Sequence, residues 1–187
     1  MTTQPEHITR PRLPVHDIET APEASRDALA HQAARVGKVI NIFGTMANSP
    51  ALMNVYDLVE THLAEHSSLD DATRQAIHLT VAAVNDCEYC QAAYTGAAKR
   101  AGFTVEETIA IRHGALPDHP KLQALITLTR QIADNRGYVD ESVWSETLEA
   151  GWSEEEILDA YTDVVRTILT NYFNHLVGTD LDLPPAP

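Results

Sequence analysis

Two cysteines, Cys87 and Cys90, are the side chains whose type and spacing predict chemistry most directly, and the chain contains no other cysteine. They belong to the stretch Asp86-Cys87-Glu88-Tyr89-Cys90, which directly follows an apolar run. In a reducing compartment such a pair is typical of redox chemistry or of metal binding, not of a structural disulfide framework. The choice between these two uses decides the functional prediction.

Zinc binding is the first alternative to thiol redox chemistry. A structural zinc site needs four ligands, and the sequence has no second Cys-x-x-Cys motif. The candidate histidines, His113 and His119, lie farther from the cysteines than the histidine pair of a zinc finger does. Inert cysteines buried in a core are the second alternative. The residues favour a redox pair that uses no metal and no other cofactor.

The composition narrows the setting of this pair. The chain of 187 residues has 13 Lys and Arg against 27 Asp and Glu, which gives a net charge of −14. Because such a charge repels phosphate backbones and anionic lipid surfaces, we expect neither nucleic acid nor a membrane as partner. No apolar run approaches the ~20 residues that cross a bilayer, and residues 1–12 lack a signal-peptide pattern. We therefore expect a cytoplasmic protein.

Helical periodicity runs through most of the chain, and no stretch alternates as a strand does, so the predicted fold class is all-α, a bundle of about eight helices. The segment 71–84 is apolar almost all round, which predicts a helix in the core. Asn85 and Asp86 are expected to end this helix and to cap the next, which begins near Cys87. The other helices are expected at about 25–43, 50–66, 104–113, 121–135, 140–151 and 153–178.

The domain organisation follows from where this periodicity begins and ends. We expect an extended N-terminal arm over residues 1–24, where prolines recur without a helical period. A single all-α domain is predicted for residues 25–178, and a proline-rich tail follows over 179–187. Both candidate thiols therefore lie inside the one predicted domain.

A weak internal repeat relates residues 101–107 to residues 150–156. Each copy has a glycine, an aromatic residue and a hydroxyl-bearing capping residue followed by glutamate. Aligning the copies places Arg136 and Val139 at the positions of the two cysteines, so only the first copy carries thiols. A chance similarity between two helix starts is the alternative.

The first turn of a helix suits a redox pair. Residues i and i+3 lie on one face of a helix, and a slight distortion lets two cysteines there close a disulfide. The N–H groups and the dipole at the helix start favour a thiolate. Such a pair can supply a nucleophile without a metal.

The segment from Arg74 to Tyr94 resembles the core of the alkyl hydroperoxidase D and carboxymuconolactone decarboxylase superfamily. The pattern of that family is a glutamate, then Cys-x-x-Cys, then three further residues and a histidine. The likeness continues through Lys99-Arg100-Ala101-Gly102 and covers most of the chain after Ala51. The Cys-x-x-Cys motif in this helical setting carries the resemblance.

The resemblance implies an all-α protein that forms homo-oligomers, commonly trimers or hexamers. It implies that Cys90 attacks a hydroperoxide or disulfide substrate and that Cys87 resolves the resulting sulfenic acid. The reductant in the family is a dithiol carrier such as a lipoylated protein, in some members alongside a peroxiredoxin partner. These are expectations taken from the family.

The chain departs from the family pattern at both proton-transferring positions. Gln75 stands where the family has glutamate, and Tyr94 stands where it has histidine. An amide does not take up a proton near neutral pH, and a tyrosine is a poor base, so low peroxidase activity is expected. His78, one turn after Gln75, is the candidate that would compensate; its alternative is a core histidine bonded to a carbonyl group.

The leading hypothesis is therefore a thiol-dependent oxidoreductase that acts as a peroxidase or exchanges disulfides. Its candidate catalytic residues are Cys90, Cys87, His78, Tyr94 and Gln75. One alternative is a lyase like the carboxymuconolactone decarboxylases, whose chemistry does not need Cys-x-x-Cys. The other is a helical oligomer without catalytic activity, in which the disulfide acts only as a redox switch.

Overall fold

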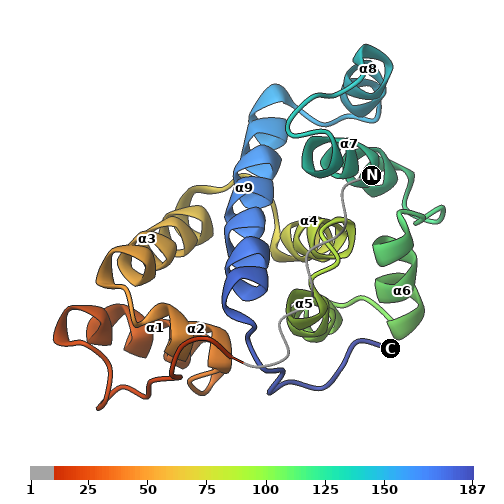
Figure 1. Cartoon of the computed structure of the whole chain (residues 1–187). Coiled ribbons are helices and arrows are strands. Elements are labelled where there is room, and N and C mark those ends of the chain that lie inside the picture. The colour runs from red at the N-terminus through yellow and green to blue at the C-terminus, as the bar shows by residue number, and fades with distance from the viewer. Residues whose placement is uncertain (1–10) are drawn as a thin grey trace, which may run out of the picture. The chain divides into compact units, whose positions relative to one another are not determined.

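The computed structural model describes residues 11–187, and over these residues the chain has one 3₁₀ helix, nine α-helices and no strand (Figure 1). The all-α prediction is confirmed. Over the same residues, no helix combines the length and the apolarity that crossing a membrane requires. The elements are η1 (Glu23–Ser25), α1 (Arg26–Val36), α2 (Asn41–Met46), α3 (Pro50–His66), α4 (Asp71–Val84), α5 (Glu88–Arg100), α6 (Val105–His113), α7 (Pro120–Asp134), α8 (Glu141–Glu149) and α9 (Glu154–Val177).

The chain divides into two compact units. Among the described residues, 11–59 and the segment Tyr172–Asp182 form the first unit, and Glu60–Asn171 with Leu183–Pro187 form the second. All five candidate catalytic residues belong to the second unit. The single domain predicted for residues 25–178 stays a prediction, and residues 1–10 of the predicted arm lie outside the described residues.

Two short helices of the first unit replace one predicted helix. Gly37 ends α1 in the left-handed region with a φ of 88°, which a residue without Cβ adopts at little cost. The backbone is extended at Ile40 before α2 begins. The continuous helix expected over about 25–43 is therefore wrong, because the apolar period continues across a break that only the backbone conformation shows.

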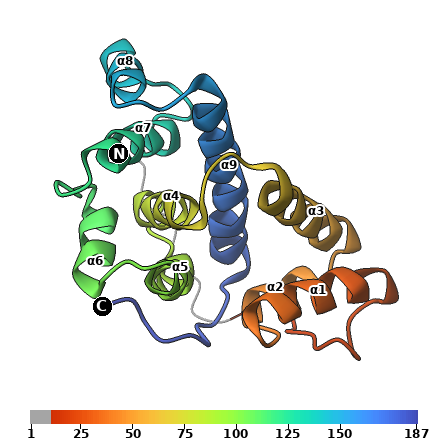
Figure 2. The same ribbon diagram turned by 180° about the vertical axis from the view of Figure 1, so that it is seen from behind.

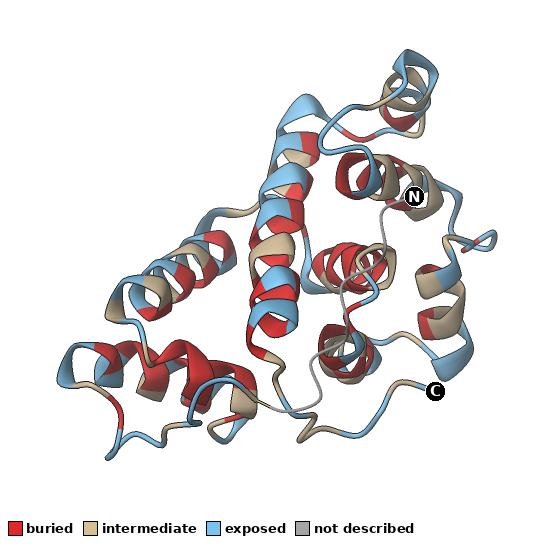
Figure 3. Cartoon of the chain, viewed as in Figure 1, coloured by how far each residue is buried: buried red, intermediate tan, exposed pale blue. Residues whose placement is uncertain are grey.

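The core helix of the second unit is α4, as its all-round apolar sequence predicts. Thr73, Arg74 and the run from Ala76 to Ala82 are buried, so that α4 is enclosed over most of its surface (Figure 3). It packs against α5, α6 and α7, and Figures 1 and 2 show α4 and α5 side by side from opposite directions. Ile77 and Val81 share a hydrophobic cluster with Val164 of α9. Burial of such side chains holds α4 in place between its neighbours.

The two segments of the sequence repeat fold in the same way. The hydroxyl of Thr104 accepts from the N–H of Glu107 at 3.1 Å, and the glutamate carboxylate accepts from the Thr104 N–H at 2.7 Å. Ser153 and Glu156 make the same two bonds at 3.2 and 2.7 Å. Each pair is a capping box that satisfies N–H groups at a helix start, one for α6 and one for α9. The predicted helix starts are therefore confirmed in both copies.

Candidate functional site

A tight turn between α4 and α5 positions the two cysteines. Asn85 ends α4, and Asp86 takes up a left-handed conformation with a φ of 52°. The N–H of Cys87 donates to the carbonyl of Ala82 at 2.9 Å, and Cys87 is itself the N-cap residue of α5. The expectation that Asn85 and Asp86 cap α5 is therefore wrong, because the turn moves the helix start one residue onward. The predicted place of Cys90 on the first turn is confirmed.

Both cysteine side chains are buried, Cys87 at 1 % exposed and Cys90 at 2 %. They lie at the start of α5, where residues i and i+3 share a face. The Sγ atom of Cys90 lies 4.0 Å from the Oγ1 atom of Thr170 on α9, within the range of a sulfur hydrogen bond. One polar neighbour of Cys90 thus comes from a helix far along the chain.

Tyr94 lies one turn after Cys90 and is directed to the same hydroxyl. Its Oη atom is 3.4 Å from Thr170 Oγ1 and accepts a hydrogen bond from Arg166 Nη1 at 2.6 Å. The guanidinium carbon of Arg166 also lies 5.6 Å from the centre of the phenol ring. Burial raises the pKa of Tyr94 to about 12, against the opposing effect of the Arg166 charge. The phenol is therefore protonated at neutral pH and acts as a hydrogen-bond donor.

The guanidinium that holds Tyr94 is itself held by a carboxylate. Nη2 of Arg166 donates to Oε2 of Glu60, a residue of α3 that is only 2 % exposed. A buried carboxylate is stable as an anion only beside such a partner. Glu60, Arg166 and Tyr94 thus form a connected row that ends at Thr170 and Cys90.

A second buried ion pair holds His78. Arg74 donates from Nε and Nη2 to the two carboxylate oxygens of Asp163 at 2.9 and 3.0 Å, and Asp163 Oδ1 lies 2.7 Å from His78 Nε2. Although burial alone would raise it, the pKa of Asp163 is held below its usual value by His78 and Arg74. Burial and the Arg166 charge lower the pKa of His78, and Asp163 opposes them. His78 is therefore a neutral imidazole at pH 7 that donates from Nε2 to Asp163.

The imidazole of His78 lies next to the phenol of Tyr94, with the ring centres 5.0 Å apart. Its Nδ1 atom is buried and has no hydrogen-bond partner among residues 11–187. An unpartnered lone pair in a buried site is costly unless a water or ligand occupies it. The alternative in which His78 bonds to a carbonyl group is wrong for Nε2, since the partner there is a carboxylate.

Gln75 does not join this group of side chains. Its Nε2 atom donates to Asp71 Oδ1 at 3.1 Å, one turn earlier on the same helix. No hydrogen bond described for residues 11–187 links Gln75 to Cys90, Tyr94 or His78. The structure thus gathers four of the five candidate residues and leaves Gln75 in a local contact along α4.

Sequence reasoning missed five residues that line this site: Glu60, Arg74, Asp163, Arg166 and Thr170. Four of the five are charged, and they stand at helix positions where the apolar period predicts hydrophobic residues. This pattern could have identified them from the sequence. On α9 the spacing of Asp163, Arg166 and Thr170 places all three on one face among buried aliphatic residues. On α4, Arg74 precedes His78 by one turn. Charged residues at such positions are rarely buried unless they are paired.

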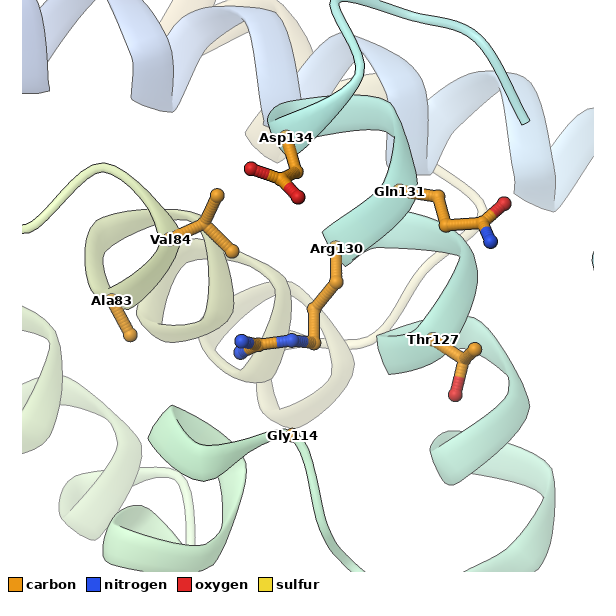
Figure 4. A pocket seen from close by; sticks show the side chains of 7 residues that line it. All are labelled: Ala83, Val84, Gly114, Thr127, Arg130, Gln131 and Asp134. Atoms are coloured by element: carbon orange, nitrogen blue, oxygen red, sulfur yellow. The ribbon is translucent and has the colours of Figure 1, made fainter. Parts of the chain in front are cut away.

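A separate cavity of about 510 Å³ lies in the second unit beside α7. Figure 4 shows Arg130 extending from α7 toward α4 and Gly114. Arg130 Nη1 donates to the carbonyl of Arg112 at 3.1 Å. The cavity is lined by Ala83, Val84, Gly114, Thr127, Arg130, Gln131 and Asp134, none of which was a candidate catalytic residue.

Comparisons with known proteins agree with this arrangement. Residues 50–131 match the family model described as the carboxymuconolactone decarboxylase family, and this segment contains both cysteines, Tyr94, His78 and Gln75. A search of curated protein sequences found no match.

Solved structures share the fold at low sequence identity. The alkylhydroperoxidase AhpD core protein of Ralstonia eutropha JMP134, an uncharacterised peroxidase-related protein, is 19% identical over 92% of this chain and 92% of that chain, with a TM-score of 0.80. A peroxidase-related protein of Silicibacter sp. TM1040 is 17% identical over 99% of this chain and 95% of that chain, with a TM-score of 0.77. A variant of the debrominase Bmp8 in complex with 2,3,4-tribromopyrrole is 14% identical, covers 93% of each chain and has a TM-score of 0.80.

The family match covers the segment that carries the cysteine pair, and the structural likeness extends over nearly the whole chain. Residues 50–131 thus resemble the carboxymuconolactone decarboxylase family, and the chain has the fold of the alkylhydroperoxidase AhpD core protein.

Proposed function

We propose that the protein is a thiol-dependent oxidoreductase that reduces a hydroperoxide by cycling a disulfide between Cys90 and Cys87. The observation that carries the proposal is the place of Cys90 on the first turn of α5, beside Cys87 and in contact with Thr170. Helix N–H groups favour the thiolate there, and a neighbouring thiol is at hand to resolve an oxidised sulfur. The near-complete burial of both cysteines favours a small oxidant such as hydrogen peroxide.

The proposed reaction has three steps. The Cys90 thiolate attacks one oxygen of the hydroperoxide, the O–O bond breaks, and the released alkoxide takes a proton to become an alcohol or water. The Cys87 sulfur then attacks the sulfenic acid at Cys90, so that a disulfide forms and water leaves. A dithiol such as a lipoyl group on a carrier protein reduces the disulfide and is itself oxidised. If a peroxiredoxin is the partner, the disulfide of its oxidised form replaces the free hydroperoxide as the substrate that the cysteine pair reduces.

The decisive experiment follows peroxide consumption with dihydrolipoamide or dithiothreitol as reductant. We expect turnover by the wild type and none by Cys90→Ser. Without added reductant, Cys87→Ser should react once, and the sulfenic acid at Cys90 should be trapped by dimedone and found by mass spectrometry. Equal peroxide consumption by all three proteins would refute the proposal. A disulfide that forms without turnover would instead support the non-catalytic redox switch.

Reductive dehalogenation is a second candidate function. The observation in its favour is the debrominase whose complex with tribromopyrrole shares this fold. The same thiol pair balances that reaction, because transfer of bromine to one sulfur and its displacement by the other gives a disulfide, bromide and a ring carbon that takes a proton. Bromide release from 2,3,4-tribromopyrrole, measured with the same reductants and the same two cysteine variants, tests it. If the protein decarboxylates a carboxymuconolactone at a rate that neither cysteine variant changes, the lyase alternative is favoured.

A further inference from the structure

The hydroxyl of Thr170 lies where three hydrogen-bonding groups converge. It donates to the carbonyl of Thr167 at 2.8 Å, lies 3.4 Å from Tyr94 Oη and lies 4.0 Å from Cys90 Sγ. A hydroxyl group has one hydrogen and two lone pairs. With its hydrogen on the Thr167 carbonyl, Thr170 can only accept from the other two groups, so it faces a protonated Cys90 as an acceptor.

The direction of the Tyr94 hydrogen is set by its other neighbour. The phenol oxygen accepts from Arg166 Nη1 at 2.6 Å, and a guanidinium has no lone pair with which to accept in return. The phenol hydrogen is therefore left for Thr170 Oγ1, at 3.4 Å. Because the pKa of Tyr94 is raised to about 12, the phenol keeps this hydrogen at neutral pH.

The charges around this row balance. Glu60 accepts from Arg166, and Asp163 accepts from Arg74, so two buried carboxylates offset two buried guanidinium groups. Tyr94, a phenol that keeps its proton, stands at the histidine position of the family pattern. A hydrogen-bond donor beside Sγ stabilises a thiolate at Cys90, and Thr170 Oγ1 lies 4.0 Å from that sulfur.

We propose that Thr170 is that donor and that its hydroxyl reverses its role when Cys90 ionises. Rotation about the Cβ–Oγ1 bond releases the Thr167 carbonyl and directs the hydrogen to Cys90 Sγ, while the thiol proton is released to solvent. Tyr94 goes on donating to Thr170 Oγ1, which polarises the hydroxyl and strengthens its bond to sulfur. Thr170 is thus the catalytic residue, because it contacts the reacting atom. Tyr94 and Arg166 are positioning residues that act through it.

The inference rests on the proposed function, because stabilising a thiolate at Cys90 matters for catalysis only if Cys90 reacts with the oxidant. The ionisation of Cys90 can nevertheless be measured without oxidant or reductant. The test uses the full chain carrying Cys87→Ser, so that Cys90 is the sole thiol. The ultraviolet absorbance of the thiolate gives the midpoint of its pH titration. The rate of alkylation by iodoacetamide at neutral pH gives a second readout.

We expect Thr170→Val to move the titration midpoint up by about one pH unit and to slow alkylation about ten-fold, the effect of losing one hydrogen bond to a charged group. Thr170→Ser keeps the hydroxyl and should stay within about two-fold of the parent protein. Tyr94→Phe, which removes only the phenol oxygen, should show an intermediate effect of about three-fold.

Thr129→Val is the matched control, because Thr129 is fully buried and its hydroxyl donates to the Leu125 carbonyl within its own helix at 2.6 Å. It should leave the Cys90 titration unchanged. An unshifted midpoint in folded Thr170→Val, or a shift in Thr170→Ser as large as in Thr170→Val, would overturn the inference. If Thr170→Val does not fold, an unshifted midpoint in Tyr94→Phe overturns it. A protein without peroxide turnover still gives this result, so failure of the proposed function is seen separately.

Discussion

Charged side chains buried next to the thiols give the site its chemical character. Glu60 is 2 % exposed, Asp163 is fully buried, and Arg74 and Arg166 are each 8 % exposed. Four such charges are tolerated in a protein interior because each carboxylate is bonded to a guanidinium. The arrangement keeps the net charge of the group near zero and leaves the neutral His78 as its titratable member.

The stability of the folded chain should therefore depend on pH through His78. Because burial lowers the folded-state pKa of His78, the unfolded chain takes up a proton at a higher pH than the folded chain does. The contribution is present above the unfolded-state pKa of ~6.5 and is lost as the pH falls below it, by up to ~1.4 kcal/mol per pH unit. Chemical denaturation between about pH 7.5 and pH 5 measures this slope.

His78→Gln is the matched variant, since its amide can still donate to Asp163 but does not titrate. Its free energy of unfolding should fall less steeply over the same pH range. Equal slopes for the two proteins would contradict the assignment of His78. Asp163 adds a separate loss at lower pH, because a carboxylate with a lowered pKa stabilises the fold above its unfolded-state value of ~3.9 and loses this effect as the pH falls.

At the scale of the helices, the residues at which α5, α6 and α9 begin determine how the site is positioned. The turn at Asp86 ends α4 and brings Cys87 to the N-cap of α5, while two capping boxes start α6 and α9. The second capping box matters for the site because α9 presents Asp163, Arg166 and Thr170. The direction in which a helix begins determines which of its faces meets its neighbours.

Both capping residues should contribute equally to stability. Thr104→Ala and Ser153→Ala each remove the hydroxyl that accepts from the third N–H of the helix, and each should lower the free energy of unfolding by about 1 kcal/mol. Urea denaturation measures the change. Thr104→Ser keeps the acceptor and should have little effect.

Thr162→Ala serves as the control for removing an exposed threonine hydroxyl. Thr162 donates only to the Leu158 carbonyl within α9, at 3.0 Å, so its loss should change the free energy of unfolding by no more than ~0.5 kcal/mol. A loss at Ser153 no larger than that at Thr162 would show that the second capping box contributes nothing to stability.

At the scale of the whole molecule, we propose that the chain forms a homo-oligomer, as the family resemblance implies. Leu158, Tyr161 and Val165 of α9 are exposed and follow one another at helical spacing, which suits an apolar contact between copies. Light scattering coupled to size exclusion should give three or six times the chain mass of 20.6 kDa. A mass of one chain at micromolar concentration would contradict the proposal.

Leu158→Glu tests whether this stripe of α9 forms the contact. A charge at the centre of an apolar interface is costly, so the variant should dissociate at concentrations where the wild type remains assembled. Tyr138→Glu is the control, because Tyr138 is 81% exposed but lies outside α9. It should leave the mass unchanged.

The sequence predicted those parts of the site that are determined by interactions between residues close together in the chain. Cys87 and Cys90 share the start of one helix, and the cap, the spacing and the glycine stops that place them there all lie within a few residues. The predicted 25–43 helix failed for the opposite reason, because the backbone break after Gly37 is not visible in the apolar period. Gln75 was a candidate because the family pattern has a glutamate at its position. In the structure its side chain donates to Asp71 on its own helix.

The sequence by itself determined the all-α class, most helix boundaries and the position of the thiol pair, because these follow from periodicity and capping within short windows. Only the tertiary structure decided what surrounds the thiols. Arg166 meets Glu60 across 106 positions of the chain, and His78 meets Asp163 across 85. Such pairs depend on how whole helices pack, since no local pattern relates residues that far apart. Thr170 of α9, whose hydroxyl faces Cys90, became visible only in the tertiary structure for the same reason.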